Sequence, residues 1–151
     1  MSVKVENLDK IINKLNNMSQ SAVTEASKSV ERNIKLIQAE AKTLCPVDTG
    51  ALRNSIETEA KIEGNKITGE VFTNMNYSAY VEFGTGQVGE QTSTDPVDVT
   101  YKQEWLGMKA QPFLYPAYKD NKDIVIKNIS EDLTKIIKGR WLHDQHKTYY
   151  F

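Results

Sequence analysis

The chain has 151 residues, of which 39% are hydrophobic, so it is long enough for one domain with its own core. Its 19 basic and 20 acidic residues give a formal net charge of -1 and are spread along the chain, which argues against nucleic acid as the main ligand, because phosphate binding depends on clustered Lys and Arg. The single cysteine, Cys45, excludes an intramolecular disulfide and a cysteine-based metal site.

The sequence carries no signal that predicts export or membrane insertion. Residues 1–12 lack the continuous apolar stretch of a signal peptide. No apolar run approaches the roughly 20 residues that span a bilayer. A lone thiol is also compatible with a reducing cytosol. We therefore expect a protein that is made in the cytoplasm and has no membrane partner.

The first third of the sequence has a helical pattern. Apolar residues within 8–15 share the spacing of one helical face. Ser19 can cap a second, longer helix, and Pro46 ends it, because the residue before a proline is pushed out of helical geometry. The predicted buried face of this longer helix consists of Val23, Ala26, Val30, Ile34, Ile37, Ala41 and Leu44.

A β-hairpin is predicted after a turn at residues 47–50. Asp48 can cap the short stretch that follows this turn, because its carboxylate can accept hydrogen bonds from free backbone N–H groups. Residues 56–62 alternate apolar and polar side chains, as a half-buried strand does, and residues 67–73 supply a partner strand. Gly64 and the residue after it suit the intervening turn.

Short elements and a long loop follow the hairpin. Asn76 is expected to cap a short helix over residues 77–83, and Gly84 to end it. The loop over residues 85–111 lacks strong periodicity, although residues 97–101 alternate weakly and could form a short strand. A loop of this length is usually functional or mobile.

A last helix is predicted with Pro116 in its first turn, where a missing N–H costs nothing, and with Gly139 as its end. Residues 125, 129, 133 and 136 mark its buried face. We expect a single α+β domain over residues 1–139, into which the loop 85–111 is inserted. In it a small antiparallel sheet, the hairpin plus one or two further strands, packs against a long N-terminal helix and a C-terminal helix.

No group of residues predicts catalysis. Cys45 has no histidine near it in the sequence and closes the apolar face of a helix, so we interpret it as a packing residue. His143, Asp144 and His146 lack a fourth ligand with a defining spacing, so a polar tail is favoured over a metal site. We therefore predict no catalytic, cofactor-binding or metal-binding residue.

Two groups of aromatic residues need an interpretation. Tyr77, Tyr80 and Phe83 have no basic neighbours, so we interpret them as core anchors rather than as a platform for nucleic-acid bases. Residues 140–151 form an aromatic tail, and large exposed apolar groups usually mark a contact surface. We favour docking on a neighbouring subunit over packing on the same chain for the tail residues Trp141, Tyr149, Tyr150 and Phe151.

Three segments in order carry a resemblance to a known family: CPVDTGALRNSI at 45–56, YSAYVEFGTG at 77–86 and QPFLYPA at 111–117. Together they resemble the minor tail-component, or head–tail joining (tail completion), proteins of long-tailed bacteriophages. The family has no established catalytic residues to carry over. The positions that match its pattern are Asp48, Gly50, Leu52, Arg53, Tyr80, Glu82, Gly84, Gly86, Pro112, Phe113 and Pro116.

The chain departs from the family pattern in its long insert between Gly86 and Gln111 and in the aromatic tail after Gly139. Both additions could bind a neighbour that is specific to this phage. Within the motifs, we predict an ion pair between Arg53 and Glu82 that joins the turn to the short helix.

The resemblance implies a non-enzymatic structural role at the neck, where related proteins form rings, commonly hexameric, around the channel that DNA traverses as passing cargo. The implied partners are copies of the chain, a tail terminator or tail tube protein, and a head-completion or connector protein, without a cofactor. The protein would assemble in the host cytoplasm and remain in the virion. Two alternatives stay open: an assembly factor that is absent from the virion, and a cell-wall hydrolase, which would need a cleft with a Cys–His or zinc site.

Overall fold

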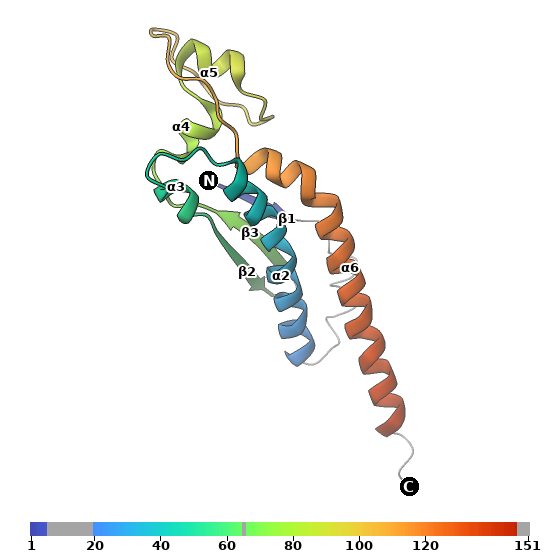
Figure 1. Cartoon of the computed structure of the whole chain (residues 1–151). Helices are drawn as coiled ribbons and strands as arrows, with labels where there is room; N and C mark the ends of the chain where they lie inside the picture. The colour runs from blue at the N-terminus through green and yellow to red at the C-terminus, as the bar shows by residue number, and fades with distance from the viewer. Residues whose placement is uncertain (6–19, 65, 148–151) are drawn as a thin grey trace.

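The computed structural model describes residues 1–5, 20–64 and 66–147, with Val5 and residues 140–147 described by their backbone alone. It confirms the predicted α+β class, with one small antiparallel sheet and two long helices (Figure 1). The elements are β1 (Ser2–Val5), α2 (Gln20–Leu44), α3 (Ala51–Asn54), β2 (Glu57–Glu63), β3 (Lys66–Phe72), α4 (Ser78–Phe83), α5 (Gly86–Thr92) and α6 (Leu114–Lys147).

The sheet has three strands in the order β1-β3-β2, so β3 is central. The predicted hairpin is confirmed, with β2 and β3 antiparallel from the pair Glu57–Phe72 to the pair Glu63–Lys66. Gly64 takes a φ of 58° in the turn, a conformation that a side chain would strain.

The third strand comes from a different place than the sequence predicts. β1 pairs antiparallel with β3 from Ser2–Phe72 to Val5–Gly69, although the first third of the chain is predicted to be helical. A strand of four residues is too short to show a clear period of two. Residues 97–101 do not form a strand. The helix predicted over residues 8–15, and Ser19 as the predicted cap of the longer helix, lie outside the described residues.

α2 lies on β2 and β3, and its predicted apolar face is largely confirmed. Gly69 of β3 lets the helix approach closely, because a Cβ built there would lie 2.7 Å from Val30 Cγ1 and 2.9 Å from Ile34 Cγ2. The two ends of the predicted face differ from expectation: Leu44 is exposed and Val23 is half-buried. At this end of the helix the buried positions are Ala41 and, just after the helix, Cys45.

α6 packs along α2 and also contacts β1, so the two long helices lie side by side (Figure 1). Pro116 falls in its first turn as predicted. The predicted end at Gly139 is wrong, because the helix continues to Lys147. A glycine inside a helix costs only about 1 kcal/mol relative to alanine, so it permits an end without requiring one.

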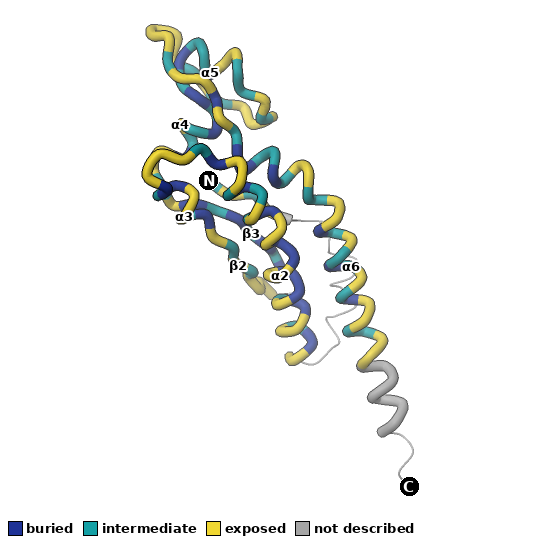
Figure 2. The backbone as a smooth tube through the Cα atoms, viewed as in Figure 1, coloured by how far each residue is buried: buried dark blue, intermediate teal, exposed yellow. Residues whose placement is uncertain are grey.

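The core lies between the sheet, α2 and α6 (Figure 2). The opposite face of the sheet is polar and carries an ion-pair network. Lys61 Nζ lies 3.2 Å from Glu59 and 3.4 Å from Glu70. Such exposed pairs contribute little to stability, because solvent and salt screen them. The core consists of Ala26, Val30, Ile34, Ile37, Ala41, Cys45, Leu52, Ile56, Ile67, Val71, Phe113, Leu114, Ala117, Val125, Ile129 and Leu133.

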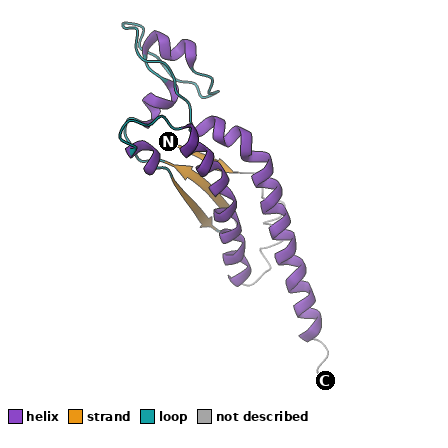
Figure 3. Cartoon of the chain, in the orientation of Figure 1, coloured by secondary structure: helices purple, strands orange, loops and turns teal. Residues whose placement is uncertain are grey.

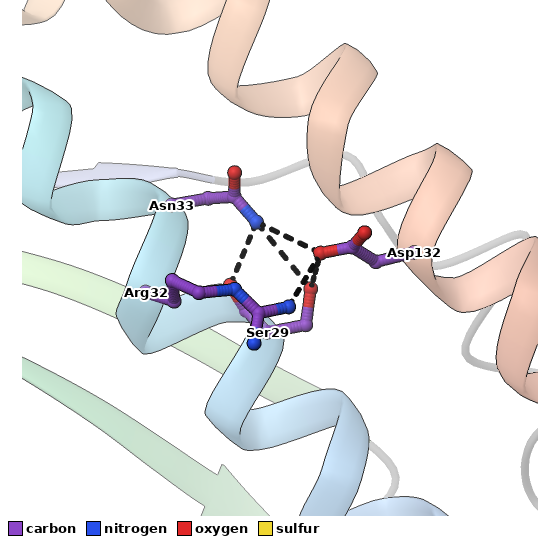
Figure 4. Close-up of polar contacts among 4 residues, drawn as sticks. All are labelled: Ser29, Arg32, Asn33 and Asp132. Atoms are coloured by element: carbon purple, nitrogen blue, oxygen red, sulfur yellow. Dashed lines mark hydrogen bonds and ion pairs between the residues drawn. The ribbon is translucent and has the colours of Figure 1, made fainter.

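A polar cluster fixes α6 against α2 (Figure 4). Asp132 Oδ2 accepts hydrogen bonds from Ser29 Oγ at 2.7 Å, Arg32 Nη2 at 2.8 Å and Asn33 Nδ2 at 3.2 Å. These bonds hold the pKa of Asp132 below its usual value, and the bond from Ser29 has the largest effect. Ser29 and Asn33 are buried although they are polar, so the apolar pattern alone could not place them in the interface.

Candidate interaction surface

The three motif segments meet at one end of the domain, where α3, α4, α5 and the start of α6 gather with the loops that join them (Figure 3). The second and third segments are joined by a backbone hydrogen bond from Gln111 N to Val81 O of 2.8 Å. The first and second segments face each other across an open hollow of about 480 Å³, which residues 46–52 line together with Tyr77, Val81, Met108 and Gln111. We call this end of the domain the motif end.

Glu82 links the second motif segment to the third. Its side chain is 1% exposed, and its carboxylate accepts hydrogen bonds from the backbone N–H groups of Phe113, Leu114 and Tyr115 at 2.8, 3.0 and 2.8 Å. The first N–H groups of a helix have no partner within the helix, and a negative charge there interacts favourably with the helix dipole. Glu82 therefore caps α6 from a position about thirty residues earlier in the chain.

The predicted ion pair between Arg53 and Glu82 is wrong. Among the described residues the two side chains form no ion pair, and Arg53 is exposed. Both carboxylate oxygens of Glu82 are instead used by backbone N–H groups. The sequence held a signal for this role: α6 is preceded by Phe113, which has no side-chain oxygen to cap it, so its N-terminus needs a partner from elsewhere.

Two other predicted caps are also wrong. Asp48 is exposed, and the N-cap position of α3 is Gly50, with a φ of 81° and no side-chain cap. The nearby Thr49 Oγ1 accepts a bond of 3.3 Å from Ala51 N. Asn76 is exposed as well, and the N-cap position of α4, Tyr77, makes no side-chain cap bond. The predicted helix end at Gly84 is confirmed, with a φ of 71°.

α4 is oriented opposite to the prediction. Tyr77 is 43% exposed and Tyr80 is 60% exposed, so they are not core anchors, and Phe83 is half-buried. The helix buries Ser78 and Glu82 instead. The reason is the cap: the carboxylate of Glu82 must face the start of α6, and this turns the aromatic side of α4 outward.

The predicted long loop is ordered as a lobe, which we define as residues 84–110. It contains α5, which the sequence does not predict, and an antiparallel bridge between Thr85 and Met108. Tyr101 Oη donates to Phe83 O at 3.0 Å, and Ala110 N donates to Thr92 Oγ1 at 2.9 Å. The two ends of the lobe are thus held together.

Glycines make the lobe possible, because its two arms approach within backbone contact. A Cβ at Gly107 would lie 1.8 Å from Thr85 O, and one at Gly86 would lie 2.7 Å from Trp105 O. Both glycines also have positive φ, 77° and 62°. The sequence predicts only a loop here. The signal that could have indicated a folded segment is the presence of a glycine near each of its ends, Gly86 and Gly107.

Large apolar side chains are exposed at the motif end and on the lobe. A second hollow of about 240 Å³ lies between α4 and the lobe, lined by Tyr80, Phe83, Val99, Tyr101 and Trp105 among others. Patches of this kind usually mark a contact surface. We call the motif-end surface the set of exposed residues Val47, Tyr77, Tyr80, Val97, Trp105, Leu106 and Met108.

The remaining predicted site residues take structural places. Leu52 and Phe113 are buried in the core, and Pro112 and Pro116 are half-buried. Cys45 is buried, and desolvation raises the pKa of its thiol.

The predicted contacts of the aromatic tail, and the histidines near it, fall on side chains outside the described part. Trp141 lies within α6, but its side chain and residues 149–151 lie outside the described part. The side chains of His143, Asp144 and His146 are likewise not described. Within the described part, no three His, Cys, Asp or Glu side chains gather as a metal site would require, and no helix is both long and apolar enough to cross a membrane.

The geometry defines a small α+β protein with several large apolar side chains exposed at one end. The family described as "Bacteriophage HK97-gp10, putative tail-component" matches residues 9–84, that is 76 of 151 residues, and the chain belongs to this family. The matched region includes the first motif segment and most of the second. No curated protein and no solved structure matches the chain. Family membership makes the protein a component of the phage tail and thus of the virion.

Proposed function

We propose that the protein is a non-enzymatic structural subunit of the phage neck or tail end, and that it works by assembling into a ring, hexameric as the resemblance implies. The observation that carries the proposal is the motif-end surface, where seven large apolar side chains are 42–71% exposed on a rigid scaffold. A tail component with such a surface is suited to contact other virion proteins.

The proposed mechanism is geometric. A head-to-tail interface repeats around an axis and closes into a ring, whose centre lets DNA pass without specific contacts. Neighbours above and below would be a tail terminator or tail tube protein and a head-completion or connector protein. Assembly would take place in the host cytoplasm, before the finished particle carries the ring out.

The sheet edge offers a second contact for ring formation. β2 lies at the edge of the described sheet, and no described strand pairs with the side of Glu57–Glu63 that faces away from β3. A strand edge of this kind can pair with an extended segment of another chain. The edge is charged, which is a common protection against uncontrolled pairing.

The test is the composition of the virion. Purified particles should contain the protein in a fixed number of copies by quantitative mass spectrometry, and labelled antibody should locate it at the neck or tail end by electron microscopy. A phage without the gene should yield separate heads and tails. Particles that lack the protein, while assembly still depends on the gene, would contradict the virion role and favour an assembly factor.

A further inference from the structure

The hollow between α4 and the lobe, which we call the lobe hollow, is a built apolar site. Its walls include Tyr80 and Phe83 of α4 and Val99, Tyr101 and Trp105 of the lobe, and it has a volume of about 240 Å³. Tyr80 and Trp105 are 60% and 55% exposed, although both carry large apolar surfaces. Binding sites for apolar groups are typically concave and lined in this way.

The walls are held in place before anything binds. Tyr101 is fixed by its hydroxyl bond to Phe83 O, and the loop segment that carries Trp105 is fixed by Gln87 N, which donates to Trp105 O at 3.3 Å. Gln103 further donates to Glu90 Oε2 at 2.7 Å. A preorganised site loses little conformational entropy on binding, so even a small apolar contact area can produce measurable affinity.

The chain also contains a segment that fits such a site chemically. Residues 141–151 include five large apolar side chains within eleven residues: Trp141, Leu142, Tyr149, Tyr150 and Phe151. Aromatic side chains bury a large area and favour offset or edge-to-face contacts with other rings, which Tyr80, Tyr101 and Trp105 can offer.

The same chain's tail cannot occupy its own lobe hollow. α6 begins at Leu114 next to α4 and runs away from the lobe along its whole length (Figure 1). At about 1.5 Å per residue, Trp141 lies roughly 40 Å along the helix from Leu114, and Lys147 about 50 Å. Four further residues span at most about 14 Å, which is too short to return.

We infer that the lobe hollow binds an aromatic side chain from residues 141–151 of a second copy of this chain. Each chain carries one hollow and one tail at opposite ends of α6, so every contact is between unlike surfaces. Such a contact repeats from copy to copy and closes into a ring when the rotation allows it. The inference rests on the self-assembly part of the proposed function and identifies the two surfaces that meet.

The test uses two full-length variants. The hollow variant carries Tyr80→Ala and Trp105→Ala, and the tail variant carries Trp141→Ala, Tyr149→Ala and Phe151→Ala. In sedimentation velocity the wild-type chain should associate more as its concentration rises, and each variant alone should remain monomeric. An equimolar mixture of the two retains one complementary hollow and tail, so it should form one-to-one dimers and nothing larger.

Leu36→Ala is the matched control, because Leu36 is 43% exposed on α2, outside both surfaces, and it should associate like the wild type. All variants should keep the wild-type circular dichroism spectrum and thermal midpoint, which excludes unfolding as the cause. The inference is overturned by a tail variant that associates like the wild type, by mixed variants that stay monomeric, or by a wild-type chain that is monomeric at every concentration reached. Any of these results leaves detection of the protein in virions unaffected, so the two proposals fail separately.

Discussion

The carboxylate of Glu82 caps the start of α6, a role that a residue next to the helix has in most proteins. It is buried and satisfies three backbone donors at the start of α6, and thereby joins two motif segments that are distant in the sequence. Its role explains why an acidic residue lies on the buried side of α4 between aromatic residues that are not buried.

Replacing Glu82 by Gln should therefore destabilise the domain. The amide keeps the shape but removes the charge and turns an NH₂ group toward backbone donors, which should cost about 2–3 kcal/mol in the free energy of unfolding. Urea denaturation measures this cost. Glu104→Gln, at an exposed position of the lobe, is the control and should change stability by less than about 0.5 kcal/mol. Equal stabilities of the two variants would contradict the cap.

Asp132 should make stability depend on acid pH. Its pKa in the folded chain lies below the ordinary value of 3.8, mainly because Ser29 and Arg32 donate hydrogen bonds to it. The stabilisation is therefore fully present above about pH 4 and is lost as the pH falls through the lower folded pKa. The side chain is 26% exposed and Arg32 67%, so we expect about 1 kcal/mol.

The measurement is urea denaturation at pH 7 and at several values below pH 4, on the wild type and on Asp132→Asn. The variant should be less stable at pH 7 by about 1 kcal/mol and should lose less stability on acidification. Parallel pH profiles for the two chains would show that the cluster in Figure 4 does not couple folding to protonation of Asp132.

At the scale of elements, two glycines allow a matched comparison of packed and open positions. Gly69→Ala should destabilise by about 1–3 kcal/mol, because its Cβ would lie 2.7 Å from Val30 and 2.9 Å from Ile34 in the core. Gly139→Ala should stabilise by about 0.5–1 kcal/mol, because the residue lies inside α6 with no neighbouring atom within 4 Å of the new methyl group. Thermal unfolding of both variants measures the difference, and effects of equal sign would contradict this packing of α2 on β3.

The elements that the sequence predicts well are those whose own periodicity determines their packing. α2 and β3 bury most of the residues that the 3.6-residue and two-residue periods select, and α6 buries Val125, Ile129 and Leu133, whereas β2 is at most half-buried and leaves Ile62 exposed. β1 is too short to show a period. Its pairing with β3 depends on where the chain returns in space, which local patterns do not contain.

The interaction surface could be predicted only in part, for a similar reason. The motif segments indicated which residues belong together, but the orientation of α4 depends on Glu82 and on backbone donors about thirty residues later. An apolar pattern places Tyr80 inside the core, whereas the buried cap places it outside at 60% exposure. At this position, hydrogen bonds between polar groups that are distant in the sequence outweigh the local apolar pattern.

At the scale of the whole molecule, the contacts that hold the fold together and the exposed large apolar residues are separated. The core and the cluster around Asp132 hold α2, α6 and the sheet together, whereas the exposed large apolar residues Tyr77, Tyr80, Trp105 and Leu106 gather at the opposite end from Lys147 (Figures 1 and 2). Variants at the motif-end surface should therefore impair assembly without lowering the thermal midpoint. A variant such as Leu106→Ala, at 71% exposure, is suited to this measurement. A large loss of thermal stability would show that the residue has a packing role instead.

The continuation of α6 through Gly139 to Lys147 has a consequence for the size of an assembly. Each turn of a continuous helix adds about 5.4 Å to the distance between its two ends and leaves the side chains at either end unchanged. Relatives of this chain with longer or shorter last helices would then place their neighbours at different spacings while using the same contacts. If the tail of one copy binds the lobe hollow of the next, the length of this helix sets the spacing between neighbouring copies and thus the circumference of the ring.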